Sequence, residues 1–187
     1  MSEEEDFEAK FSRHRLRGDT PPLDLQCLLK HRYELAARTG IQLNASPGWA
    51  PWLDTSHLSA SASKNPGVRA NIRAIADTCA FIDFVAMDED RNFFGYWRGP
   101  AQLPLAEAPI VCLDNEGQFR FAGTKTLAGL LFTEGGAFDD FRAWFEGIGI
   151  DQLPSGRYEL FTVQMQPSPA DLHEELYAKY ELEERGL

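Results

Sequence analysis

The chain has 187 residues, of which 43% are hydrophobic and 12% aromatic, and it carries a formal net charge of −11 at pH 7. This length and composition predict one globular domain with a substantial core. The acidic balance argues against a nucleic-acid-binding protein, because phosphate binding requires a basic face.

The lengths of the apolar runs and the number and spacing of the cysteines indicate where in the cell the protein is expected. No apolar run reaches the roughly 18 to 20 residues of a membrane span, so we expect no membrane partner. The acidic N-terminus lacks the apolar stretch of a secretory signal. Cys27, Cys79 and Cys112 are odd in number and widely spaced, which is typical of reduced thiols in a cytoplasmic protein.

The N-terminal third is predicted to be helical. Residues 1–18 hold five acidic and four basic residues and are expected to form a charged, loosely helical extension, with a single domain over 19–187. Thr20 is a plausible N-cap for a helix that Gly40 closes. The Ser-, Ala-, Pro- and Gly-rich segment 44–64 is long for a loop and is expected to pack through its two tryptophans.

The middle of the chain predicts a helix followed by a run of strands. The helix is expected near 65–80, with an apolar face formed by Val68, Ile72, Ile75, Ala76 and Cys79. The strands are predicted at 81–87, 93–98, 109–113 and 118–122. Helical spacing then returns in "TLAGLLF" and "AFDDFRAWFEGIG", 156–166 alternates like a strand, and Ser168 is expected to cap a final helix. This order predicts an α+β fold, an antiparallel or mixed β-sheet meander packed against several α-helices.

The stretch "MDEDRNFFGYWRG" resembles a calcium loop at first sight, because Asp88, Asp90 and Asn92 alternate. A calcium loop would need glycine at its sixth position and glutamate at its twelfth, where this chain has Phe93 and Gly99. Runs rich in aromatic and β-branched residues flank the acidic stretch on both sides. The pattern therefore favours a hairpin turn over a metal site.

The meander also makes a geometric prediction. In consecutive antiparallel strands, the first and third turns lie at the same end of the sheet. Those turns are "DEDRN" and "DNEG", in a region (83–116) that nets −5. We therefore predict an acidic rim, formed by Asp88, Glu89, Asp90, Asp114 and Glu116.

Catalytic and cofactor motifs are not evident. The sequence has no G-x-S-x-G elbow, no phosphate-binding loop and no histidine pattern typical of a metal site. Cys112 lies within a predicted strand and is interpreted as a small core residue. We therefore predict no catalytic residues, no cofactor and no metal. Trp97 is either a core residue or, beside the acidic rim, an interface anchor.

The stretches "FIDFVAMDEDRNFFGYWRG" and "APIVCLDNEGQFRFAGTKTLAGLLF" resemble the SMI1/KNR4 family, also called the SUKH superfamily. The resemblance covers about 70–132 and rests on structural motifs. It implies an α+β fold without catalytic residues. Bacterial members are often immunity proteins, which bind and neutralise a toxin delivered between competing cells, commonly a nuclease.

The resemblance leads to a functional hypothesis. We expect a non-catalytic immunity protein whose cognate toxin is encoded by a neighbouring gene. The residues expected to contact the toxin are Asp88, Glu89, Asp90, Asp114, Glu116 and Trp97. An acidic rim suits the basic cleft of a nuclease. The alternatives are a regulatory scaffold of the SMI1/KNR4 type, an unrecognised enzyme, or a rim that is only the solvated end of two turns.

Overall fold

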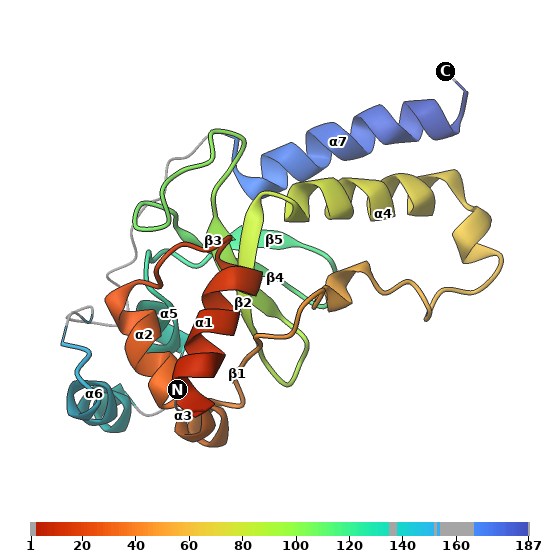
Figure 1. Cartoon of the computed structure of the whole chain (residues 1–187). Coiled ribbons are helices and arrows are strands. Elements are labelled where there is room, and N and C mark those ends of the chain that lie inside the picture. Colours follow the sequence, from red (N-terminus) through yellow and green to blue (C-terminus); the bar gives the residue numbers. More distant parts are fainter. Residues whose placement is uncertain (1–2, 135–137, 152, 154–166, 187) are drawn as a thin grey trace.

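The computed structural model describes residues 3–134, 138–151, 153 and 167–186 (Figure 1). The strands form one antiparallel sheet in the order β1-β2-β3-β4-β5, so the predicted α+β meander is confirmed. The strands are β1 (Gln42–Leu43), β2 (Ile82–Met87), β3 (Phe93–Trp97), β4 (Ile110–Leu113) and β5 (Phe119–Phe121). The helices are α1 (Glu3–Arg15), α2 (Leu23–Lys30), α3 (Arg32–Thr39), α4 (Pro66–Cys79), α5 (Leu127–Glu134), α6 (Phe138–Gly147) and α7 (Pro169–Glu184), with short 3-10 turns η1 (Pro51–Leu53) and η2 (Ala62–Lys64).

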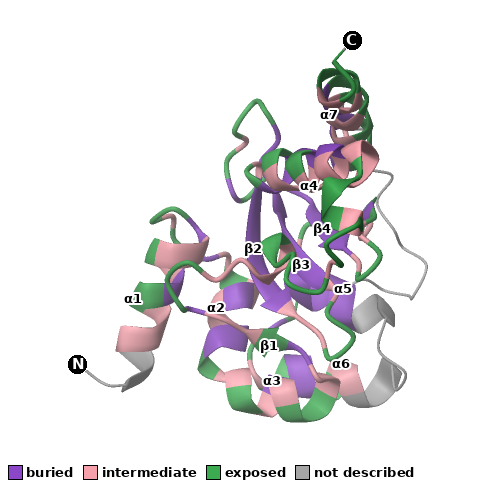
Figure 2. Ribbon diagram, turned by 90° about the vertical axis from the view of Figure 1, so that its right-hand side faces the viewer, coloured by how far each residue is buried: buried purple, intermediate pink, exposed green. Residues whose placement is uncertain are grey.

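Helices cover both faces of the sheet, so its strands are buried throughout most of their length (Figure 2). Phe94 and Tyr96 of β3 point into a core that α1, α2, α3, α5 and α6 complete. Phe93 and Trp97 point the other way, into a core completed by α4 and α7. None of the helices in the described ranges has the length and apolar character needed to cross a membrane.

The N-terminal segment departs from the prediction of a loose extension over 1–18. Phe11 and Leu16 are fully buried in the first core. Arg17 donates from Nε to the buried Asp83 carboxylate of β2 at 2.7 Å. Burial raises the pKa of Asp83, although Arg17 and Arg98 both favour its charged form. Although this segment carries many charged residues, Phe11 and Leu16 form a short apolar face that packs it against the rest of the fold.

The helix predicted after Thr20 differs in its start and is divided into two. Thr20 and Pro21 each precede a proline, and this position disfavours helical backbone. The chain is still extended at Pro22 (ψ 155°), so α2 begins only at Leu23 and Thr20 does not cap it. His31 leaves the helical conformation (φ −103°, ψ 23°) and separates α2 from α3. Gly40 ends α3 in the left-handed conformation, as predicted.

The sheet confirms the four predicted strands to within one residue at each end and adds one that the sequence did not indicate. This added strand, β1, has only two residues, which pair with Met87 and Ala86 at the sheet edge. So short a strand shows no alternation from which it could be predicted. Ser168 caps α7 as expected, in a reciprocal pair with Asp171. The strand predicted at 156–166 lies outside the described residues.

Gly95 provides a test of the packing between β2 and β3. A Cβ atom at this position would lie 2.7 Å from the backbone oxygen of Asp83 and 2.7 Å from Ile82 Cγ2. Gly95→Ala should therefore lower the free energy of unfolding by about 2–3 kcal/mol, because the strands must move apart. Gly147→Ala is the matched control, since a Cβ atom added there would have no neighbouring atom within 4 Å, and it should not destabilise the fold. Urea denaturation of both variants measures this, and equal stabilities would contradict the packing described.

Candidate functional site

The β2–β3 and β4–β5 turns lie side by side at one end of the sheet, as the meander predicts. Asn115 of the second turn donates its backbone N–H to Asn92 Oδ1 at 3.3 Å. Its side-chain Nδ2 donates to the backbone oxygen of Asp90 at 3.1 Å. The two turns that carry the residues of the predicted acidic rim are therefore adjacent.

Two of the five rim carboxylates stabilise the turns themselves. Asp88 accepts hydrogen bonds from the backbone and side-chain nitrogens of Asn92, at 2.8 and 2.7 Å. Asp114 accepts from the backbone nitrogens of Glu116 and Gln118, at 3.0 and 2.8 Å. Because these bonds are local, Asp88 binds its own turn and does not present the alternating ligands of a metal loop. No group of three or more potential metal ligands occurs within the described part of the chain.

The other three carboxylates are exposed. The Glu89 side chain lies over Gly40, at the end of α3. Asp90 makes no side-chain hydrogen bond or ion pair to any residue that the structure describes. Glu116 accepts one hydrogen bond, from Gln118 Nε2 at 3.3 Å. Asp90 and Glu116 are therefore the rim residues best placed to meet a partner.

Trp97 is not part of this surface. Its side chain is fully buried in the second core, where its ring lies 6.3 Å from that of Phe81. The helices on both faces of the sheet leave no exposed position in β3. The prediction that Trp97 contacts a partner is therefore wrong, and the alternative of a core residue is correct.

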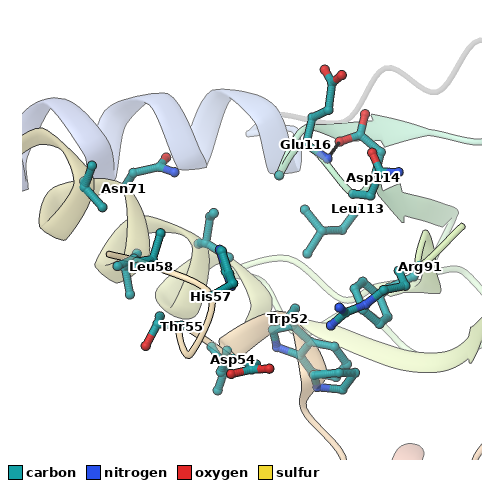
Figure 3. Close-up of a pocket in the computed structure, with 18 of the residues that line it drawn as sticks. Trp52, Asp54, Thr55, His57, Leu58, Asn71, Arg91, Leu113, Asp114 and Glu116 are labelled. Atoms are coloured by element: carbon teal, nitrogen blue, oxygen red, sulfur yellow. Dashed lines mark hydrogen bonds between the residues drawn. The ribbon is translucent and has the colours of Figure 1, made fainter. Parts of the chain in front are cut away.

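A half-open groove of about 990 Å³ adjoins the rim, and sequence reasoning did not predict it (Figure 3). Apolar side chains from η1, α4, β3 and β4 line it, including Trp52, Leu53, Ile72, Ile75, Phe93 and Leu113. Four carboxylates and one arginine also line it, namely Asp54, Asp90, Asp114, Glu116 and Arg91. With His57 neutral, the lining carries a net charge of −3.

The packing of α4 explains why this groove has an apolar interior. The face of α4 that is fully buried contains Ala70 and Ala74, which pack against Tyr180 of α7. Small side chains allow two helices to approach closely. Of the predicted apolar face, Cys79 and Ile75 pack in the second core as expected. Val68 and Ile72 are only partly buried and line the groove together with Ile75. α7 lies beside α4 (Figure 1) and makes ion pairs such as Arg69–Glu184 at 2.7 Å.

Aromatic stacking holds the opposite wall of the groove, as predicted for the tryptophans of 44–64. The Trp52 ring lies 4.2 Å from that of Phe84 and 5.5 Å from that of Phe93. Trp49 stacks edge-on against Trp52 at 5.4 Å. Arg15 of α1 donates to the backbone oxygen of Trp49 at 2.8 Å, so this wall is fixed to the N-terminal helix as well as to the sheet.

Arg91 contributes the cation of the groove lining and has an unusual backbone. Its φ of 65° falls in the left-handed region, where glycine or asparagine is favoured. The side chain points over the groove from the β2–β3 turn (Figure 3). Hydrogen bonding to Ser56 lowers the pKa of Asp54, and His57 and Arg91 add smaller electrostatic contributions. Arg91 is therefore one of the charges that act on Asp54.

Alanine substitutions should distinguish the two kinds of rim carboxylate. Asp88→Ala should lower the free energy of unfolding by about 1–2 kcal/mol, because two hydrogen bonds in the turn are lost. Asp90→Ala removes the same charge two residues away and should change it by no more than about 0.5 kcal/mol. Chemical denaturation checks both values. Equal losses would mean that Asp90 also supports the turn.

Comparison with protein-family models, with curated proteins and with solved structures finds no match to this chain.

Proposed function

We propose that this protein is a non-catalytic immunity protein that binds and neutralises a cognate bacterial toxin acting in the cytoplasm. The observation that carries the proposal is the pairing of two acidic turns, more than twenty residues apart in sequence, beside an apolar groove. The likeness of residues 70–132 to the SMI1/KNR4 family supports the same proposal.

The electrostatics of the rim favour a basic partner. Asp90 and Glu116 are exposed, and the acidic groove lining is continuous with them. Clustered charge of one sign steers an oppositely charged protein and raises its association rate. A nuclease must hold phosphate and often has a basic cleft, so it is the class of toxin that this surface suits best.

Charge reversal tests the proposal with the product of the neighbouring gene as the candidate toxin. Asp90→Lys combined with Glu116→Lys should slow association at least tenfold at low salt and flatten its salt dependence. The turns should survive, because Asp88 and Asp114 are retained. Association rates measured by surface plasmon resonance, together with rescue of growth in cells that express the toxin, give the two readouts.

The control pair is Glu107→Lys with Asp151→Lys. Both residues are exposed, both variants change the net charge equally, and Glu107 lies in the β3–β4 connection at the opposite end of the sheet. Equal association rates for the two pairs would contradict the role of the rim. A chain that binds many partners weakly, and no toxin, would instead be a regulatory scaffold.

A further inference from the structure

We infer that the groove accepts one segment of the partner protein, a segment in which an apolar anchor side chain is flanked by lysine or arginine. The identity of the partner rests on the proposed function, whereas the chemistry of the segment follows from the groove lining alone. Ile72 and Ile75 of α4 form part of the apolar lining and are only partly buried, so an incoming apolar side chain would cover them further.

The edge of the groove supports an apolar anchor. Leu53 lies at this edge and is 46% exposed, although large apolar side chains are usually covered when they adjoin other apolar surface. Trp52 and Leu113 point into the groove (Figure 3). An aliphatic or aromatic side chain in the groove would be surrounded by this apolar lining, as are the anchor residues that dominate binding energy in protein interfaces.

Size and charge favour a polypeptide occupant. The volume of about 990 Å³ lies at the upper limit for small-molecule pockets, and the groove is half-open. The net charge of −3 on its lining would repel nucleic acid and anionic lipid surfaces. The remaining occupant that matches both the apolar interior and the acidic margin is a protein segment with basic residues on either side of an apolar one.

Removal of the Arg91 charge tests whether basic residues of the partner enter the groove. It is the cation within an otherwise acidic lining. If basic residues of the partner enter the groove, Arg91 opposes them and its removal strengthens binding. Arg91→Asn removes the charge and places at φ 65° a residue that tolerates this conformation, so the variant should fold.

The first experiment uses fluorescein-labelled peptides and measures anisotropy. The probe is Gly-Lys-Lys-Leu-Phe-Lys-Lys-Gly, compared with peptides in which Ser-Ser replaces Leu-Phe or glutamate replaces lysine. The full chain should bind the probe at least tenfold more tightly than either comparison peptide. Equal binding of the Ser-Ser peptide would overturn the apolar anchor, and tighter binding of the glutamate peptide would overturn the basic flanks.

Matched variants locate the binding. Leu53→Lys should weaken probe binding at least fivefold, whereas Leu23→Lys should change it less than twofold. Leu23 is 78% exposed at the start of α2, outside the groove, and the two variants alter charge identically. Arg91→Asn should strengthen binding about twofold or more. Equal effects of Leu53→Lys and Leu23→Lys, or weaker binding by Arg91→Asn, would overturn the inference.

The same variants separate this inference from the proposed function. If the toxin complex forms equally well with Leu53→Lys and Leu23→Lys but weakens on charge reversal of the rim, the immunity proposal stands and the groove assignment is wrong. If no toxin binds but the probe depends on Leu53, the groove assignment stands and the immunity proposal is wrong.

Discussion

Burial of β3 on both faces is the constraint on which the rest of this structure depends. Phe94 and Tyr96 enter one core and Phe93 and Trp97 enter the other, so helices must cover the sheet on both sides. Gly95 allows β2 to approach closely within this arrangement. Because β3 is fixed between β2 and β4, the β2–β3 turn and the β4–β5 turn lie side by side at one end of the sheet. The acidic residues that these turns carry are therefore brought together.

The second consequence concerns α4, which is shared between the fold and the groove. Its small residues, Ala70 and Ala74, pack against α7, and its larger apolar residues face the space between the sheet and the 51–58 segment. Stability and binding thus use different sides of one helix. The groove wall opposite α4 is held by Trp52 against Phe84 and Phe93, so the site is built mainly by contacts that also maintain the second core.

Local sequence patterns predicted the strands and the acidic rim because both depend on short-range chemistry. Aromatic and β-branched runs mark β2 to β5, and the order of the strands follows from short turns. The covered side of α4 was predictable only for Cys79 and Ile75, which pack in the second core. Ala70 and Ala74 are covered because α7, about a hundred residues away, packs against them. Phe11 and Trp97 show the same limit of prediction from sequence. Alternation or helical spacing predicts the direction of a side chain, but it does not predict which other element will pack over that side chain.

The central claim is that the partner binds at the end of the sheet where the two acidic turns meet the groove. Hydrogen–deuterium exchange of the full chain, with and without the product of the neighbouring gene, tests it most directly. The account predicts that the complex protects the backbone of the β2–β3 turn, the β4–β5 turn and the 51–58 segment. Protection confined to α1, α2 and α3, on the other side of the sheet, would contradict it.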